Sequence, residues 1–444
     1  MQMPRLDSAS PEWSSQWLMP VVYEESRGCT HSFFRLIANA RVTMPVAEIA
    51  HTALFRASKR AQGSLTALSR QQGGFPARSF SSTAPTKKLL ATRIPNGGII
   101  SVHGPNTYKL LQGLVTNDVR RFEEQVQSLG ADPSREEDAF YCGFLNPQGR
   151  LIAPSFVLPT EKASDQAPTV LLDCHKDSLN SLKTFITKFM LRSRVKMQDA
   201  TSEWKTWVVW SDDASAEDKL SGQAASENNA RAYRDARTPR MGWRVVSKSD
   251  APESAWASLF SHAPTQVEAS EYTRHRMIQG VPEGPVELPE NSSLPLEANL
   301  DLMGGVDFRK GCYVGQELTA RTHHTGVVRK RVIPVRLSSS GGEAEGATPP
   351  IGQIRAPPSA GAASKRSKAA GSLLAAIGDG QGGALGLAML RLQHVANAQS
   401  TLELPHPDGE GKPSWAVQPT WPGWWPSQIR ESFEKEAQGG AAED

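Results

Sequence analysis

Cysteine is scarce in this chain: the 444 residues include only Cys29, Cys142, Cys174 and Cys312. No two of them form a CxxC pair, which argues against a disulfide framework and against a zinc site built from these cysteines alone. Cys142 and Cys174 lie in apolar strand patterns, where a buried, inert thiol is expected. The spacing indicates a reducing compartment.

Long apolar runs and a strong net charge are missing as well. No stretch of about 18 or more apolar residues occurs, so the sequence predicts no membrane span. The formal net charge is only +3, whereas nucleic-acid binding needs Lys and Arg clustered on the folded part of a protein. We therefore expect no nucleic-acid partner.

The chain is long enough for more than one folded core. Its 444 residues exceed the roughly 250 to 300 at which single cores stop growing, so two or three domains are expected. Two apolar runs around a turn at 146–149 predict a hairpin. Apolar residues at i, i+3, i+4 and i+7 predict a helix over 178–195. Composition and periodicity thus indicate a mixed α and β protein.

Residues 1–90 have the composition of a mitochondrial transit peptide with a disordered N-terminus. Between residues 27 and 90, ten Lys or Arg stand against a single acid, Glu48, and import presequences are basic and poor in acids. The first 26 residues do contain acids, so translation could begin at Met44 as well as at Met1. The alternative is a plain disordered basic tail.

A β-domain is expected over residues 331–430. Strand patterns at 329–337 and 382–392 flank residues 338–371, whose low-complexity sequence cannot bury enough apolar area to fold alone. We expect this stretch to be a disordered insertion in the β-domain. Residues 431–444 are expected to form a disordered tail.

The clearest functional signal is the stretch "RKGCYVGQELTART" at residues 309–322. It places Cys312 beside glycines and basic residues, features that favour the reactive thiolate form of a cysteine. Cys312 could be a nucleophile, a metal ligand or a small core residue in a tight turn. One thiolate cannot hold an iron-sulfur cluster, which generally needs about four ligands.

This stretch resembles the K-G-C-[FY]-x-G-Q-E signature of the YgfZ-type folate-binding family, which is related to aminomethyltransferase, the T-protein of glycine cleavage. Its fixed positions are filled by Lys310, Gly311, Cys312, Tyr313, Gly315, Gln316 and Glu317. Further similar stretches are "LLQGLVTNDV", "FLNPQGRL", "LRSRVKMQD", "DARTPRMGWR" and "GLAMLR". The resemblance covers most of residues 91–425.

The resemblance implies an α+β fold with three subdomains arranged as a cloverleaf around a central pocket. Residues 91–330 would form two α+β subdomains of the aminomethyltransferase-like folate-binding domain, and residues 331–430 a C-terminal β-barrel-like unit. Mitochondrial members of the family are iron-sulfur cluster assembly factors. The chain is therefore expected in the mitochondrial matrix, where it would mature 4Fe-4S client proteins with an A-type iron-sulfur carrier protein.

The alternative function is that of a tetrahydrofolate-dependent aminomethyl or one-carbon transferase. The transferase relatives carry an acidic pair after the hairpin, where this chain has Ala153 and Pro154, and their chemistry needs a carboxylate beside the folate nitrogen. The folate-binding glutamate of the relatives is also missing from residues 276–280. We expect no aminomethyl transfer, and tetrahydrofolate binding only as a family property.

The resemblance also assigns roles to single residues. Cys312 would be one ligand of a bridging iron-sulfur cluster shared with the partner. Gln316 and Glu317 could fix the loop by hydrogen bonds, or could contact a pterin-like ring or a partner. Four residues are expected to line the pocket: Asn117, Asp118, Arg276 and Arg321. Asn117 and Asp118 could instead cap a helix. Arg321 could bind an anionic ligand.

Overall fold

The computed structural model describes residues 88–120, 138–160, 167–211, 229–339, 348–356, 368–380, 382–397, 402–406 and 414–439. These residues belong to one part of the chain, Thr83–Asp444. The predicted transit peptide lies outside them, apart from its last three residues. Among the described residues, no helix is both long and apolar enough to cross a membrane.

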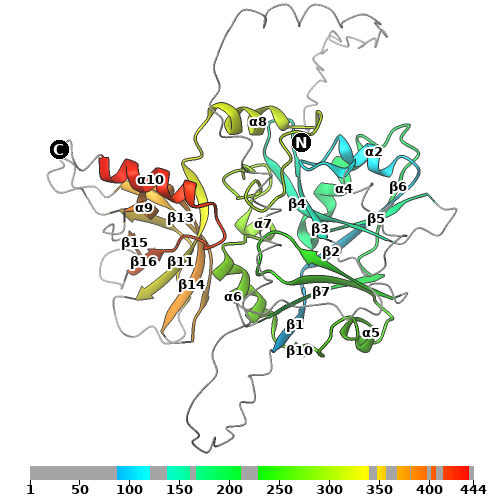
Figure 1. The fold of residues 1–444 in the computed structure, drawn as a ribbon, viewed down its shortest axis with the longest axis horizontal. Coiled ribbons are helices and arrows are strands. Elements are labelled where there is room, and N and C mark those ends of the chain that lie inside the picture. The colour runs from blue at the N-terminus through cyan, green and yellow to red at the C-terminus, as the bar shows by residue number, and fades with distance from the viewer. Residues whose placement is uncertain are drawn as a thin grey trace, which may run out of the picture. The chain divides into compact units, whose positions relative to one another are not determined.

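Ten strands form a mixed sheet whose spatial order departs from the chain order (Figure 1). In space they follow one another as β10 (Thr265–Gln266), β1 (Leu89–Arg93), β7 (Trp204–Ser211), β9 (Trp243–Lys248), β8 (Ala230–Asp235), β3 (Asp138–Leu145), β4 (Leu151–Pro159), β5 (Thr169–His175), β2 (Gly97–His103) and β6 (Lys196–Asp199). Strands β3 and β8 pair in parallel at only two positions. This short seam joins two largely antiparallel halves.

The predicted hairpin is formed by β3 and β4, and its turn is confirmed. Oδ1 of Asn146 accepts hydrogen bonds from the backbone N–H groups of Gln148 and Arg150, both at 3.0 Å. Gly149 has a φ of +79°, a conformation that glycine adopts without strain. The Asn-Pro-Gln-Gly sequence supplies the residues that such turns prefer.

Short helices cover the two halves of the sheet. α2 (Thr107–Gln112) and α4 (Leu179–Thr187) share a core with β2 to β5, and α5 (Glu253–Ala257) packs on β8 and β9. The helix predicted over 178–195 ends at Thr187, and the positive φ values of Arg192 and Arg194, 65° and 56°, exclude a helix further along this stretch. As a consequence Phe189, expected on the buried side, is 40% exposed.

A closed six-stranded barrel confirms the C-terminal β-domain. Its strands, in spatial order, are β11 (Lys330–Ser339), β14 (Gly383–Arg391), β13 (Lys368–Gly378), β12 (Gln353–Ala356), β15 (Leu402–Leu404) and β16 (Trp415–Pro419). Alternate side chains of β11, including Ile333, Val335 and Leu337, face the barrel core with Trp415. The helix α6 (Ala269–Gln279) contacts both β1 and β14, and so connects sheet and barrel.

Two predictions about the C-terminal region were wrong. Part of the expected insertion 338–371 is barrel wall: β12 alternates exposed and buried residues, with Ile354 fully buried, and β13 begins at Lys368. The expected tail 431–444 begins inside α10 (Ser427–Gly439). Ile429 and Phe433, four residues apart on one helix face, pack on the barrel core. Few apolar residues suffice where a neighbouring core is already present.

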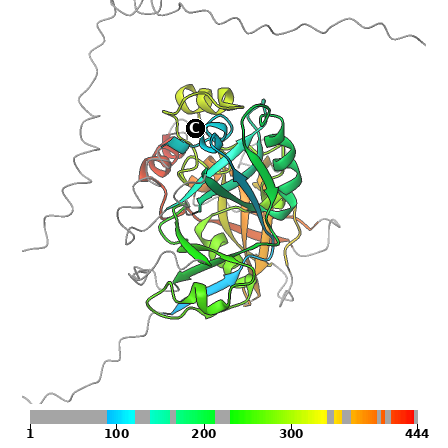
Figure 2. The same cartoon turned by 90° about the vertical axis from the view of Figure 1, so that its right-hand side faces the viewer.

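The cysteine motif lies at the end of the fold where α2 and the hairpin turn are found (Figure 2). It follows the helix α7 (Gly284–Glu287) and a long irregular segment, and leads into α8 (Gln316–Thr325). The backbone N–H of Val314 donates to the carbonyl of Gly113 at 3.1 Å, and that of Asp307 donates to Thr116 at 3.0 Å. The motif is therefore hydrogen-bonded to the chain segment that follows α2.

Candidate functional site

The three cysteines of the described residues differ in exposure. Cys142 and Cys174 are buried, as the sequence predicts, whereas Cys312 is exposed. Burial raises the pKa of the Cys142 thiol to about 12 and that of Cys174 further, so both stay protonated and inert at neutral pH. Cys312 is the one thiol of the three that a partner or a reagent can reach directly. A small core residue is excluded as its role.

Lys310 fixes the cysteine loop to the chain segment at the end of α2. Its Nζ donates hydrogen bonds to the backbone carbonyls of Gln112 at 2.8 Å, Val115 at 2.5 Å and Asn117 at 3.1 Å. It also lies 4.7 Å from the centre of the Tyr313 ring. Burial lowers the pKa of Lys310 to about 8. The ammonium group therefore binds the end of α2, although the sequence suggested that it would activate the thiol.

At Gly315, unlike at Gly311, the structure leaves no room for a larger residue. Its φ is +78°, and a Cβ atom there would lie 2.3 Å from the carbonyl oxygen of Asn146 in the hairpin turn. At Gly311, by contrast, a Cβ atom would meet nothing within 4 Å. Oε1 of Gln316 accepts a hydrogen bond from the backbone N–H of Tyr313 at 3.0 Å and closes the turn. Gln316 thus fixes the loop, one of the two roles left open.

The side chains of Asn117 and Asp118 also form hydrogen bonds with backbone groups. Nδ2 of Asn117 donates to the carbonyls of Tyr141 at 2.9 Å and Gly304 at 2.8 Å, which ties the hairpin to the segment before the motif. Oδ1 of Asp118 accepts from the backbone N–H of Arg120 at 3.1 Å, as a cap does. Hydrogen bonding from the Arg120 side chain lowers the pKa of Asp118 to about 2.

A small central cavity lies at the meeting point of β4, β5, β9 and the segment around α7. Its volume is about 50 Å³, and its lining includes Pro154, Asp173, His175, Arg237, Arg244 and Glu283. None of the four residues predicted to line the pocket belongs to this lining. Arg276 lies behind it, paired with Glu287, and Arg321 is exposed on α8. These four residues do not line this cavity, and a pocket-lining role for them stays a prediction.

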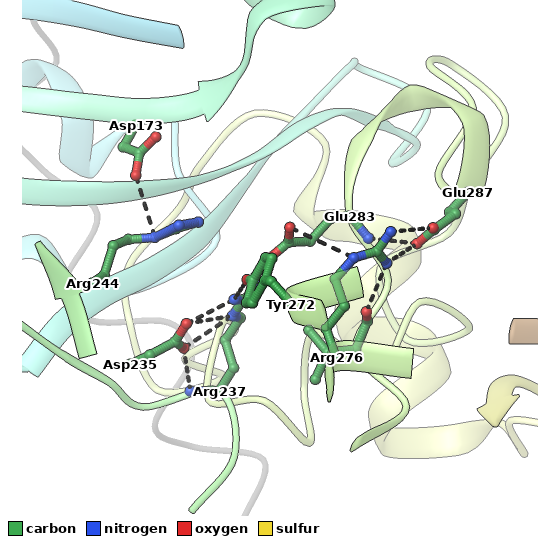
Figure 3. A network of polar contacts seen from close by, with 9 residues as sticks. Asp173, Asp235, Arg237, Arg244, Tyr272, Arg276, Glu283 and Glu287 are labelled. Atoms are coloured by element: carbon green, nitrogen blue, oxygen red, sulfur yellow. Dashed lines mark hydrogen bonds and ion pairs between the residues drawn. The ribbon is translucent and has the colours of Figure 1, made fainter. Parts of the chain in front are cut away.

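Arg237 is the centre of the charged network beside the cavity (Figure 3). Its guanidinium donates to Asp235 at 2.7 Å, to Glu283 at 2.6 Å and to the hydroxyl of Tyr272 at 3.1 Å. Burial would raise the pKa of Glu283, but the attraction of Arg237 and Arg276 outweighs it and lowers this pKa to about 2. Glu283 is therefore ionised at neutral pH and holds two buried arginines.

A second ion pair on the cavity wall, between Arg244 and Asp173, has no hydrogen bond between its paired atoms. Nε of Arg244 lies 3.2 Å from Oδ2 of Asp173, but neither atom is aligned for a hydrogen bond. The guanidinium of Arg244 instead lies over the Phe156 ring, 4.1 Å from its centre. Burial raises the pKa of Asp173 to about 6, although Arg244 acts against this shift. Asp173 is thus a weak acid that titrates just below neutral pH.

The positions of the expected acidic pair carry no carboxylate. Ala153 is buried and Pro154 lines the cavity. The carboxylates that do reach the cavity, Asp173 and Glu283, come from β5 and from the segment after α6, and both face arginines. Neither residue was predicted from the sequence. Glu283 lies in "GVPEGPVELPE", which holds charged residues among prolines and glycines. Asp173 lies in the apolar strand β5.

The described residues contain no group of three or more His, Cys, Asp or Glu side chains placed to hold a metal ion. His323 and His324 follow the motif on α8, where His323 stacks on Phe308 with ring centres 3.5 Å apart. Cys312 is therefore an exposed soft ligand to which the described part of the chain adds too few partners for a complete site.

Comparisons with known proteins agree with this arrangement. A sequence profile of the CAF17 C-terminal β-barrel domain matches residues 329–427. The mitochondrial iron-sulfur cluster assembly factor IBA57 homolog of Mycosarcoma maydis is 37% identical over 379 residues, which cover 78% of this chain and 86% of the relative. IBA57 of Mus musculus is 33% identical over 344 residues, covering 76% and 86%.

One solved structure bears on the fold alone. The glycine cleavage aminomethyltransferase T of Bartonella henselae superposes with a TM-score of 0.52 at 10% sequence identity, over 76% of this chain and 86% of that one. The aminomethyltransferase-like fold that the motifs predicted is confirmed.

Proposed function

The chain belongs to the family of mitochondrial iron-sulfur cluster assembly factors called IBA57, and on this premise we propose that it builds or inserts 4Fe-4S clusters in the mitochondrial matrix. Its working partner would be an A-type iron-sulfur carrier protein, and 4Fe-4S proteins would be its clients. Cys312 would supply one ligand to a cluster that the two proteins share.

The observation that carries this proposal is the exposed thiol of Cys312 on a loop fixed from several sides. A thiolate is a soft ligand for iron. Because the described residues offer no set of three metal ligands, the remaining ligands would come from the carrier. Lys310, Tyr313, Gly315 and Gln316 would hold the loop in place, and Glu317, exposed on α8, would face the partner.

The transferase alternative has less support. Ligand pockets commonly measure about 300 to 1,000 Å³, whereas the central cavity measures about 50 Å³. Ala153 and Pro154 supply no carboxylate beside it. Tetrahydrofolate binding would need the cavity to open. Calorimetric titration with tetrahydrofolate separates the two functions, since a transferase requires a tight folate complex.

The test is cluster loading of the full chain with its carrier under anaerobic conditions. We expect Cys312→Ser to abolish the spectroscopic signature of the shared cluster and its delivery to an apo client. Cys142→Ala is the matched control, because it removes a thiol that is buried in the core. If Cys312→Ser loads and delivers a 4Fe-4S cluster as well as the unchanged chain, the role of this thiol is refuted.

A further inference from the structure

A groove runs beside α8, distinct from the central cavity. Its volume is about 500 Å³. One face of α8 forms a wall with Leu318, Thr319, Thr322 and Thr325, positions that recur on a single side of a helix. The other walls come from residues 294–297, from residues 326–330 and from Arg391 at the end of β14. We call this surface the α8 groove.

The α8 groove has exposed apolar side chains and one hydroxyl without a hydrogen-bond partner. Val327 is 64% exposed and Leu318 is 36% exposed, so two apolar side chains meet water at its edge. The hydroxyls of Thr322 and Thr325 donate to carbonyls one turn earlier, at 2.9 Å each. The Thr319 hydroxyl is buried in the wall without a hydrogen-bond partner. A buried hydroxyl left unpaired costs free energy.

The rim of the groove is basic. Lys330 pairs with Glu297, with 3.2 Å between Nζ and Oε1. Arg329 and Arg391 are exposed and form no ion pair with any residue that the structure describes. The lining thus keeps two positive charges that no acid of its own balances. Such a rim complements a surface that carries carboxylates around an apolar side chain.

The groove is physically continuous with the cysteine loop. Gly149 lines the groove, and a Cβ atom there would lie 3.0 Å from the carbonyl oxygen of Gly315 and 3.0 Å from Cβ of Leu318. Gly315 precedes α8, and Cys312 lies three residues before it. The ten residues of α8 span about 15 Å. A partner that ligates a cluster at Cys312 is thus within reach of the groove.

We propose that the α8 groove is the docking surface for the carrier protein that shares the cluster, through an acidic surface of that carrier with an apolar side chain at its centre. This inference rests on the proposed function. The apolar side chain would occupy the groove beside Leu318 and Val327, while carboxylates face Arg329 and Arg391. Docking at this surface positions the carrier's ligands near Cys312 before a cluster forms.

The test is calorimetric titration of the cluster-free A-type carrier into the full chain at low and at moderate salt. We expect the double variant Arg329→Glu/Arg391→Glu to weaken binding by about 10- to 100-fold, and Val327→Asp to weaken it by about tenfold. Binding by the unchanged chain should weaken with salt. The control is Arg336→Glu, an exposed arginine on β11 about 20 Å along the strand from Lys330.

The outcomes separate this inference from the proposed function. A large loss in the groove variants with little change in Arg336→Glu supports docking at the groove. Equal affinity of the groove variants and the unchanged chain, or an equal loss in the control, overturns the docking surface. If the unchanged chain still shares a cluster through Cys312 in that case, the proposed function stands. If the unchanged chain neither binds the carrier nor shares a cluster, both fall.

Discussion

The central cavity and the cysteine loop use charge in opposite ways. Beside the cavity, the buried Arg237 and the half-buried Glu283 are bound mainly to each other and to their charged neighbours. In the loop, the single buried charge, Lys310, binds backbone carbonyls, and the side chain of Cys312 is exposed. The first arrangement holds segments distant in sequence together, whereas the second fixes a short loop and leaves the Cys312 side chain exposed. Variants in the two regions should therefore affect different measurements.

The largest expected effect is on the cavity side, at Arg237. Replacing it with Met leaves the buried Asp235 and the half-buried Glu283 without this partner, and breaking a buried pair on one side costs about 3 to 5 kcal/mol. We expect the free energy of unfolding in urea to fall by that amount. The labelling rate of Cys312 in the folded protein should stay unchanged.

The control for Arg237→Met is Arg430→Ala. Arg430 forms an exposed pair with Glu434 one helical turn away, at 2.7 Å, and such pairs contribute about 0.5 kcal/mol or less. If both variants lose the same small stability, the cavity network does not hold the fold. A faster labelling of Cys312 in Arg237→Met would show that the two regions are coupled.

The same contrast explains how far the sequence could be interpreted. The hairpin turn is local, because Asn146 and Gly149 determine it within four residues, and it was predicted correctly. The pair of Arg237 and Glu283 joins residues 46 positions apart, and no spacing rule identifies such a contact. β12 was missed for a related reason, since its four residues are a stable strand only between β13 and β15.

At the candidate site, too, the sequence predicted the local feature but not the roles that depend on contacts distant in sequence. The motif identified Cys312 as the central residue, and the structure places it on the surface. The roles of the motif residues around it could not be predicted from their chemistry alone. A lysine beside a cysteine suggests activation of the thiol, but the tertiary contact directs Lys310 to the carbonyls after α2. Contacts made across nearly two hundred residues decide what that side chain does.

An intermediate effect is expected on the loop side, at Gly315. Gly315→Ala places a side chain at a φ of +78° and 2.3 Å from the Asn146 carbonyl oxygen. The left-handed conformation alone costs roughly 1 to 2 kcal/mol, so we expect the loop to shift and the labelling rate of Cys312 to change severalfold. Gly311→Ala is the matched control, because its Cβ atom would meet nothing within 4 Å. Unchanged labelling in Gly315→Ala would contradict the idea that this contact fixes the thiol.

The most gradual expected effect is a pH dependence at Asp173. Burial raises the pKa of its carboxyl from 3.8 to about 6, so between these values the folded protein binds more protons than the unfolded chain. The stability contributed by this proton is complete below pH 3.8 and is lost as the pH rises through about 6. Its slope can reach at most about 1.4 kcal/mol per pH unit.

Asp173→Asn isolates this contribution. Burial lowers the pKa of His275 to about 4. The protonation of His275 therefore reduces the stability of the folded protein as the pH falls over the same range, opposite to the effect of Asp173. Glu283 loses its stabilising charge only below about pH 4.5. The informative quantity is therefore the difference in unfolding free energy between the unchanged chain and Asp173→Asn from pH 7 to pH 4.5. We expect the unchanged chain to gain stability relative to the variant as the pH falls; a constant difference would mean that Asp173 is already ionised and fully paired with Arg244.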